Sequence, residues 1–557
     1  MTARLDVAPE RGSGTYERTP GPSVRSPSVQ TILVVSALLI LGGALRFYRL
    51  SGRSLWLDEI LVWDFSGGTS IGAVVRRLSA VPSLMPLHFV ISWIIRRFGD
   101  SEIWLRLVPA VAGTLSVPAM FSLARDLFGR RTAVIAALLV AVAPFLIWYS
   151  QENAAYSMLT LLTIVQMQLA YLAVTRSRLI YWLGFSIVTL VSLYNDYFAL
   201  LATAAAFAFI GLVLARRVLS PHPALPQRGR EILAGVGSGL IVLLGYLPWL
   251  PILRTFLHHQ EYGLSRFSPS HHATMAEVQS YLAIFGLEGV VLILFVAGLV
   301  VAALWTVRRK PEAVLLTVLW LVLPVAAFFY SLRGGLVTLW PRYLIFVLPA
   351  ALLLVALAID EVSTWLGRIA GRRSTLISGL ATIAGVTVVL IQVVPSLAAS
   401  YQLPKDDWRG AAAFVESNSS PDSVVIDVGN DSYWVQEAMG YYLHHQPSPI
   451  LHVDAGQPLD PSLVSRLESS HGTVWVAFVT DDAPDDFRKQ NLIAAAIDNH
   501  VNRVTTTGVD IRRFTGVAVV RLQRQDLSPT DQARALLGWS LQFQPSLVSV
   551  LKVLGGT

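Results

Sequence analysis

The sequence predicts a polytopic α-helical membrane protein that carries a small α/β domain at its C-terminal end. Of the 557 residues, 54% are hydrophobic and only 14% are charged, whereas soluble domains carry about 25% charged residues. Uninterrupted apolar runs recur through the first 400 positions, and each is long enough to cross a hydrocarbon core of about 30 Å. Beyond them, short segments mix polar and apolar residues.

Composition also excludes several classes of function. The chain contains no cysteine, which excludes disulfides, thiolate catalysis and cysteine-ligated metals. The net charge is +7, but the lysines and arginines stand in short clusters between apolar runs. This distribution is typical of the cytoplasmic loops of membrane proteins and does not indicate a nucleic-acid partner. Because no Gly-rich phosphate loop and no metal-ligand spacing is present, we expect no cofactor and no metal.

The N-terminal region is predicted to be a tail followed by a membrane helix. Residues 1–28 are rich in Pro, Ser, Gly and Arg, a composition that predicts a disordered cytoplasmic tail. The apolar run that follows lacks a small-residue cleavage site, so we interpret 30–48 as a retained helix rather than a signal peptide. It opens a transmembrane module predicted at 29–399. With the N-terminal arginines inside, the helix leads the chain to the outer side.

The first outer loop is predicted at 50–103 and to contain juxtamembrane helices. Its segment "PLHFVISWIIRRFG" at 86–99 is apolar but short, and segments of this length are more often interfacial than spanning. If it lies along the outer interface, the span at 104–124 runs inward and the basic segment 125–131 becomes cytoplasmic, as its charge favours. We therefore predict that 86–99 does not cross the membrane.

The remaining spans follow from the same alternation of apolar runs and basic loops. Basic segments at 215–230, 307–310 and 367–373 fall on the cytoplasmic side. About eleven spans in the cell membrane result, with the N-terminus inside and the C-terminus outside. After the first two, the spans are predicted at about 132–149 and 156–174, as two within 180–215 that turn at 194–196, as one ending at 246–251, as two flanking 307–310, as one opening at 342, and at about 375–397.

From about residue 400 the composition becomes that of a folded soluble domain. The stretch "DDWRGAAAFVESNSSPDSVVIDVGNDSYW", which begins at Asp406, predicts a helix, a Ser/Pro turn and a strand. Segments 473–480 and 514–524 are further predicted strands. We predict an extracytoplasmic α/β domain at 400–557, whose role the sequence leaves open.

Polar residues gather at the span ends that face the outer side. Asp58 and Glu59 directly follow the first helix, in "SLWLDEILVW", where a carboxylate at membrane depth costs roughly 3 kcal/mol. Their shared depth predicts that they converge with the polar residues of other outer loops. Carboxylates can take a proton from an alcohol, and guanidinium groups can hold an anion. The other candidates are Arg106, Gln151, Glu152, Asn195, Asp196, Arg342 and Tyr343.

The chain contains, in this order, the motifs "SLWLDE", "MPLHF", "FGDSEIWLRLVPAVAGTLSV", "LFGRR", "PFLIWYSQENAAYS", "YLPWLP", "PRYLIFVLPA" and "DDWRGAAAFV". Their succession resembles the dolichyl-phosphate-mannose protein mannosyltransferase-like family. Members of this family are glycosyltransferases of the GT-C fold, and they include bacterial enzymes that use polyprenyl-phosphate sugars. The resemblance covers about 30–420, and the acidic pair after the first helix is its most telling motif.

The resemblance implies an inverting transfer from a polyprenyl-phosphate sugar to an acceptor hydroxyl on the outer face. Asp58 would be the general base, and Arg106 and Arg342 would stabilise the leaving phosphate, so that no general acid and no metal is required. Glu59 would orient Asp58 or contact the donor. The expected partners are this donor, a glycan, lipid or protein acceptor, and membrane lipids. The expected substrate-binding residues are Glu59, Arg106, Gln151, Glu152, Arg342 and Tyr343.

Three positions depart from the pattern of the family. Met85 stands where relatives commonly have proline, Ala154 replaces an arginine, and Asp196 replaces a histidine. A lost cation and a gained anion can change the choice of donor or acceptor. The sugar and the acceptor are therefore left unassigned.

Two other functions stay open. A secondary transporter or flippase of lipid-linked sugar would also hold ionisable groups in the membrane, although usually near its midplane and with internal repeats. A non-catalytic envelope protein would bind lipid-linked sugar without transferring it. At single positions, Arg106 and Arg342 could instead extend to lipid headgroups, and the pairs Gln151–Glu152 and Asn195–Asp196 could be loop or turn residues.

Overall fold

The structure is a computed structural model of the whole chain. Parts of the predicted tail, of the basic loop 215–230 and of the C-terminal domain lie outside the residues that it describes. The described residues are 28–219, 225–258, 275–308, 310–333, 340–402, 405–420, 422–428, 432–443, 450–453, 474–479, 510–514 and 517–522.

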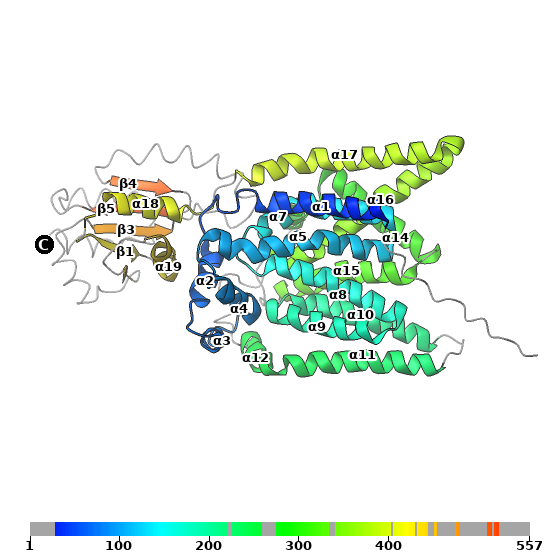
Figure 1. Cartoon of the computed structure of the whole chain (residues 1–557), viewed down its shortest axis with the longest axis horizontal. Coiled ribbons are helices and arrows are strands. Elements are labelled where there is room, and N and C mark those ends of the chain that lie inside the picture. Colours follow the sequence, from blue (N-terminus) through cyan, green and yellow to red (C-terminus); the bar gives the residue numbers. More distant parts are fainter. Residues whose placement is uncertain are drawn as a thin grey trace, which may run out of the picture.

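Long helices form a bundle, and three short helices lie at the end of the bundle that faces the α/β domain (Figure 1). The short helices are α2 (Leu57–Phe65), α3 (Ile71–Ser79) and α4 (Pro86–Ile95). The bundle contains α1 (Val29–Phe47), α5 (Glu102–Leu127), α6 (Arg130–Val142), α7 (Pro144–Ser150), α8 (Tyr156–Arg176), α9 (Leu179–Asn195), α10 (Ala199–Leu219), α11 (Leu225–Tyr246), η1 (Leu247–Trp249), α12 (Leu250–His258), α13 (Met275–Ile284), α14 (Gly289–Arg308), α15 (Pro311–Arg333), η3 (Pro341–Val347), α16 (Leu348–Ile369), η4 (Gly371–Arg373) and α17 (Ser374–Ser400).

The described residues contain eight helices that are long and apolar enough to cross a membrane, or ten spans if each of two bent helix pairs counts as one. The bent pairs are α6 with α7 and α13 with α14. Helix α9 is apolar but has only 17 residues, and the predicted count of eleven depends on whether it spans. The predicted polytopic helical fold is confirmed, whereas the exact number of spans stays a prediction.

The bend between α6 and α7 has a chemical cause. Pro144 has no backbone N–H, so it interrupts the helical hydrogen-bond ladder, and the two helix axes differ by 56°. The interruption leaves carbonyl groups without helical partners inside the membrane, where water cannot satisfy them. Arg46, fully buried on α1, donates to the carbonyls of Val140 and Ala141 at 3.0 Å each. It thereby joins α1 to the broken span.

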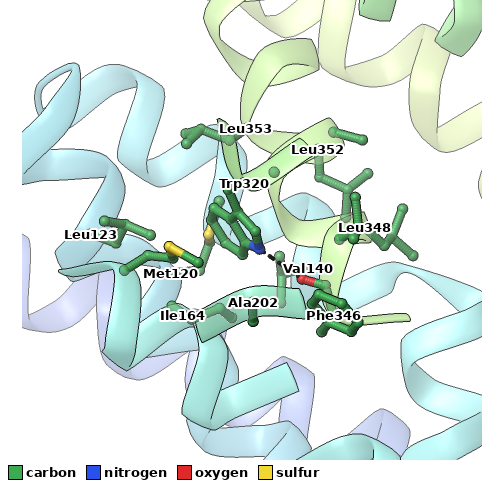
Figure 2. Packing of buried hydrophobic residues seen from close by; sticks show 14 of the residues in the cluster. Met120, Leu123, Val140, Ile164, Ala202, Trp320, Phe346, Leu348, Leu352 and Leu353 are labelled. Carbon is green, nitrogen blue, oxygen red and sulfur yellow. Dashed lines mark hydrogen bonds between the residues drawn. The ribbon is translucent and has the colours of Figure 1, made fainter. Parts of the chain in front are cut away.

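The centre of the bundle is held by close packing. Lipid tails are as apolar as leucine, so helices associate in a membrane through van der Waals contact and hydrogen bonds rather than through the hydrophobic effect. Trp320 of α15 is fully buried, and its indole N–H donates to the carbonyl of Phe346 at 3.0 Å (Figure 2). Met120, Ile164 and Leu353 lie in the same cluster, so side chains from four helices meet there.

Within the described residues, the α/β domain contains a mixed sheet of five strands in the order β2-β1-β3-β5-β4. Strand β1 pairs in parallel with β2 and β3, whereas β5 pairs antiparallel with β3 and β4. The strands predicted at 473–480 and 514–524 are confirmed as β3 and β5. The elements are α18 (Trp408–Asn418), β1 (Val424–Val428), α19 (Ser432–Tyr442), β2 (Leu451–Val453), β3 (Val474–Val479), β4 (Asp510–Phe514) and β5 (Val517–Leu522).

The α/β domain and the first outer loop share one hydrophobic core. Leu55, Ile60 and Leu105 from the N-terminal half are buried in the same cluster as Trp408 and Trp475 from the domain. Removing such side chains from water is worth roughly 1.5–3 kcal/mol for each large aliphatic residue. This contact fixes the domain beside α2, the helix that contains the acidic pair.

Candidate active site

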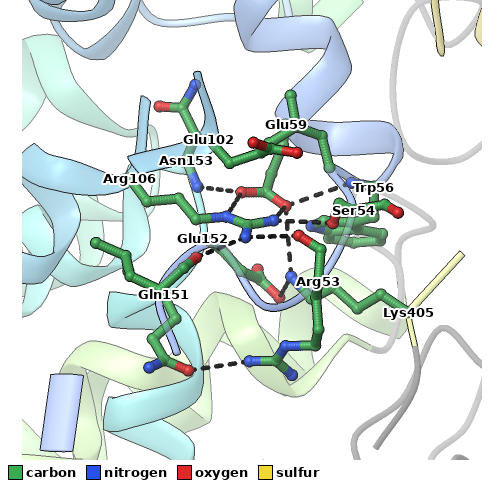
Figure 3. Close-up of polar contacts among 12 residues, drawn as sticks. Arg53, Ser54, Trp56, Glu59, Glu102, Arg106, Gln151, Glu152, Asn153 and Lys405 are labelled. Carbon is green, nitrogen blue, oxygen red and sulfur yellow. Dashed lines mark hydrogen bonds and ion pairs between the residues drawn. The ribbon is translucent and has the colours of Figure 1, made fainter. Parts of the chain in front are cut away.

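The acidic pair lies in the first turn of α2. Trp56 precedes the helix, and its backbone N–H donates to the Glu59 carboxylate at 3.3 Å (Figure 3). Negative side chains are favoured at this end of a helix because its first N–H groups have no helical partner. The two carboxylates nevertheless have different surroundings: Glu59 is fully buried, whereas the side chain of Asp58 is 31% exposed.

Glu59 forms a buried, bidentate ion pair with Arg106. Both Glu59 oxygens lie 2.7 Å from Arg106 nitrogens (Figure 3). The remaining N–H groups of Arg106 donate to the carbonyls of Leu50, Arg53 and Ser54 at 2.8 to 2.9 Å. A guanidinium has five N–H donors, and all five are used. Arg106 therefore holds the first outer loop, and the geometry argues against the expected role of this residue in phosphate binding.

The same contacts determine the protonation state of Glu59. Burial alone would raise its pKa, but the charges of Arg106 and Lys405 and the hydrogen bonds from Arg106 and the Asn153 N–H outweigh burial and lower the pKa to about 2. Glu59 is thus a permanent carboxylate with its oxygens occupied. This arrangement favours orientation of the helix over direct contact with the donor.

The loop after α7 is joined to this pair by its backbone. The N–H of Asn153 donates to Glu59 at 2.8 Å. The side-chain amide of Gln151 donates to the carbonyls of Arg46 and Tyr48, and its oxygen accepts from Arg53 at 3.0 Å. Gln151, expected to bind substrate, instead connects the loop to the end of α1.

Glu152 has a cationic partner that sequence reasoning missed. Lys405, between α17 and α18, lies 2.8 Å from one Glu152 oxygen and 3.5 Å from Glu59 (Figure 3). Burial raises the pKa of Glu152, although Lys405 acts against this increase. Burial likewise lowers the pKa of Lys405, although the two glutamates act against this decrease. Lys405 immediately precedes the motif "DDWRG", and this adjacency was the signal that could have identified it.

Asp58 faces Arg342, at the start of η3. The closest approach of the two side chains is 3.5 Å, and the Arg342 side chain is only 10% exposed. Its Nε and Nη1 atoms are buried and have no hydrogen-bond partner among the described residues. Four aromatic rings lie within 6.0 Å of the guanidinium, namely those of Trp56, Tyr156, Trp340 and Tyr343. A partly exposed carboxylate and a buried guanidinium with two unpartnered nitrogens thus lie side by side.

Comparisons with known proteins bear on the family and the fold. A family model described as dolichyl-phosphate-mannose-protein mannosyltransferase matches residues 83–228. This match covers about a quarter of the chain and supports its similarity to that family. A search of curated proteins found no match.

Solved structures show the same GT-C fold. One is ArnT from Cupriavidus metallidurans, in the apo state (TM-score 0.51) and bound to undecaprenyl phosphate (TM-score 0.52), at 15% identity, with 90% of this chain and 99% or 100% of that chain covered. Another is the oligosaccharyltransferase AglB from Archaeoglobus fulgidus, in complex with an inhibitory peptide and a dolichol-phosphate. It has a TM-score of 0.52 and 12% identity, over 90% of this chain and 75% of that chain.

The departures from the GT-C family pattern also have places in the structure. Asp196, at the end of α9, accepts the backbone N–H of Phe198 at 2.7 Å, and the Phe198 ring stacks on Tyr343 at 4.3 Å. Burial raises the pKa of Asp196 to about 7. Ala154 is buried, two residues after Glu152 in the same loop. Asp196 is therefore linked through the Phe198 ring to Tyr343, the neighbour of Arg342. Ala154 has no charged or hydrogen-bonding side chain.

Proposed function

We propose that this GT-C protein is an inverting glycosyltransferase that moves a sugar from a polyprenyl-phosphate donor to an acceptor hydroxyl on the outer face of the membrane. The observation that carries the proposal is the Asp58–Arg342 pair: a partly exposed carboxylate lies 3.5 Å from a buried guanidinium with two unpartnered nitrogens. A transferase of this kind needs a base on one side of the anomeric carbon and a cation near the leaving phosphate.

Asp58 supplies the base. Its carboxylate takes the proton from the acceptor hydroxyl, while the acceptor oxygen forms a bond to the anomeric carbon from the face opposite the phosphate. The bond between that carbon and the phosphate oxygen breaks, and its electron pair stays on the phosphate. The sugar configuration is inverted, the proton resides on Asp58, and the lipid phosphate leaves as a stable anion that needs no proton.

Arg342 stabilises the leaving phosphate. Its Nε and Nη1 atoms can make the paired hydrogen bonds that arginine forms with phosphate oxygens. The indole N–H of Trp56 is also buried without a partner among the described residues, beside the same guanidinium. The relatives ArnT and AglB were solved with undecaprenyl phosphate and with a dolichol-phosphate, which supports a polyprenyl-phosphate donor here.

The direction of the site supports an outer-face reaction. The α5–α6 and α16–α17 connections lie at the opposite end of the bundle from α2–α4 (Figure 1). These connections contain the basic residues Arg130, Arg131, Arg372 and Arg373. Because basic loops are retained in the cytoplasm, the end that holds Asp58 and the α/β domain is assigned to the outer side.

Substitution of Asp58 by Asn tests the proposal. Asp58→Asn keeps the shape of the side chain but cannot accept a proton, so transfer from a panel of polyprenyl-phosphate sugars should fall about 10²- to 10⁴-fold. Binding of undecaprenyl phosphate, measured by native mass spectrometry, should stay within about two-fold of wild type, since Arg342 is unchanged.

The matched control is Asp100→Asn. Asp100 lies in the same outer loop, and its ion pair with Arg96 is half exposed, so its loss should change little. Transfer by Asp58→Asn at nearly the wild-type rate would remove Asp58 from the reaction. Equal losses in the two variants would indicate damage to the loop rather than loss of a base.

A further inference from the structure

We propose that Lys405 is a positioning residue for the transfer reaction, and that through it the outer α/β domain forms a working part of the active site. The inference rests on the proposed function. Lys405 follows the last membrane helix, α17, and precedes α18. Its ammonium joins the two acidic loops that orient α2, and α2 contains Asp58.

The contacts of Lys405 are those of a buried connector. Its side chain is 4% exposed, and its Nζ atom lies 2.8 Å from Glu152 and 3.5 Å from Glu59 (Figure 3). The rings of Trp56 and Trp148 lie 5.6 and 5.3 Å from the ammonium. Both carboxylates are almost fully buried. Three chain segments far apart in sequence therefore meet at one cation.

Loss of this cation affects the two glutamates differently. Glu59 keeps its bidentate pair with Arg106, whereas Glu152 makes no other ion pair within the described part of the chain. A buried carboxylate without a cation takes up a proton or moves toward water. Glu152 precedes Asn153, whose N–H donates to Glu59, so a displaced Glu152 loop also disturbs Glu59 and the first turn of α2.

The position of Lys405 is fixed by the α/β domain. The N–H of Leu55 donates to the Tyr442 hydroxyl at 2.7 Å. Ser54 donates to Asp407 at 3.3 Å and accepts from the Arg409 N–H at 3.2 Å. These bonds attach α18 and α19 to the residues that directly precede Trp56. The domain thus fixes the position of the Lys405 ammonium beside the loop that contains Glu152.

Lys405 acts through other residues rather than on the substrate. Its ammonium forms ion pairs with two buried carboxylates and lies beside two rings, although it meets no hydrogen-bond geometry among the described residues, while Asp58 pairs with Arg342. A positioning role predicts that loss of the charge lowers kcat and leaves donor affinity unchanged. Direct binding of phosphate by Lys405 would instead raise the KM for the donor.

The test compares Lys405→Met, Lys405→Arg and a control, Lys310→Met. Lys405→Met keeps the length of the side chain and removes its charge, and kcat should fall about 10- to 100-fold, as for misplacement of a catalytic group by about 1 Å. The donor KM should change less than about three-fold. Lys405→Arg should recover most of the rate. Lys310 lies on the surface near the basic end, where it donates to the Asp126 carbonyl, and its variant should behave as wild type.

A double variant distinguishes charge from packing. If an uncompensated Glu152 causes the defect, Lys405→Met combined with Glu152→Gln should be faster than Lys405→Met alone, because neutral glutamine needs no cation. A wild-type kcat for Lys405→Met would overturn the inference. A raised donor KM at unchanged kcat, or a double variant slower than Lys405→Met, would overturn it as well.

Hydrogen exchange separates this inference from the proposed function. The amides of Trp56 and Asn153 donate to Glu59, so Lys405→Met should speed exchange at least about ten-fold in peptides covering 54–59 and 150–155, while Lys405→Arg should not. Absence of transfer by the wild-type protein would refute the proposed function only. Unchanged exchange in Lys405→Met would refute the positioning role, whether or not transfer is observed.

Discussion

Arg106 and Arg342 look equivalent in the sequence, because each opens an apolar span after an outer loop. In the structure the two side chains differ in how many of their N–H groups are hydrogen-bonded. Arg106 donates all five N–H groups to Glu59 and three carbonyls, whereas Arg342 has two buried nitrogens without partners among the described residues. One arginine holds the loop, and the other is available for an anion.

This difference predicts opposite effects of the same conservative change. Arg342→Lys keeps the charge but loses paired hydrogen bonding, so the KM for the lipid donor should rise about ten-fold at unchanged stability. Arg106→Lys should lower the free energy of unfolding by roughly 2–6 kcal/mol, because lysine has three donors where Arg106 uses five, and at least two buried acceptors lose a hydrogen bond. Steady-state kinetics and thermal unfolding in detergent measure the two effects. An unstable Arg342→Lys, or an Arg106→Lys that changes only KM, would contradict these assignments.

Residue types at span ends could be predicted from the sequence, but their partners could not. The sequence predicts Asp58 and Glu59 as an acidic pair at a span end, yet nothing in "LDE" tells which carboxylate points into protein. That depends on the helix rotation that the N–H of Trp56 and the guanidinium of Arg106 impose. Lys405 was missed for a related reason: a single lysine after an apolar run is ordinarily a solvated residue, and its two partners are distant in sequence.

At the scale of elements, lengths of apolar runs predicted the helices well, because about 20 apolar residues are needed to cross the bilayer. Bends were harder to predict. Pro144 interrupts a run of uniform hydropathy, and only the structure shows that Arg46 supplies the missing donors to α6. The packing of α7 against α5 also requires a glycine at position 113, because a Cβ there would lie 2.1 Å from the Ser150 hydroxyl. Such a close approach cannot be predicted from one helix alone.

Helix α4 is the element that decides the topology. It has only 10 residues, and its interfacial position is a prediction. If α4 does not span, the basic turn between α5 and α6 is cytoplasmic and the turn between α2 and α3 is outside. Arg130 and Thr69 are exposed in these two turns.

Single cysteines in this cysteine-free chain test that topology. A membrane-impermeant maleimide added to intact cells should label Thr69→Cys and should label Arg130→Cys only after the cells are opened. Labelling of both variants in intact cells, while a cytoplasmic marker protein stays unlabelled as the control for leakage, would place α4 across the membrane, because α4 and α5 would then both cross between the two positions.

At the scale of the whole molecule, buried ionisable groups connect stability to pH. The pKa of Glu59 is lowered from 4.5 to about 2, so the folded state favours the carboxylate. This stabilisation is complete above about pH 4.5 and is lost as the pH falls toward 2. A lowering of this size is worth about 3 kcal/mol.

His88 on α4 makes stability depend on pH in milder acid as well. It is buried, and burial lowers its pKa from 6.5 to about 4 in spite of its hydrogen bond to Asn153. The folded state favours the neutral ring, so stability is present above about pH 6.5 and is lost as the pH falls to 4. Asp196, with its pKa raised from 3.8 to about 7, acts in the opposite sense over this whole range.

We therefore expect His88→Gln to reduce the loss of stability between pH 6.5 and 4, because glutamine does not titrate. Thermal unfolding of the purified protein in detergent, followed at half-unit steps of pH, measures this difference between variant and wild type. Below pH 4 the two curves should fall together, since Glu59 is unchanged in both. Parallel curves throughout would show that His88 does not contribute.

The order in which the ribosome makes these residues determines when the site is complete. Glu59 and Glu152 are made early, and Lys405 follows Glu152 by about 250 residues. At about 5–20 residues per second, that interval lasts roughly 10–50 s. During it, the early helices can insert and pack while Glu152 still lacks its cationic partner. A chain that stalls or is cleaved before Lys405 thus leaves this carboxylate uncompensated in the membrane, and under the proposed function it would transfer sugar more slowly than the complete chain.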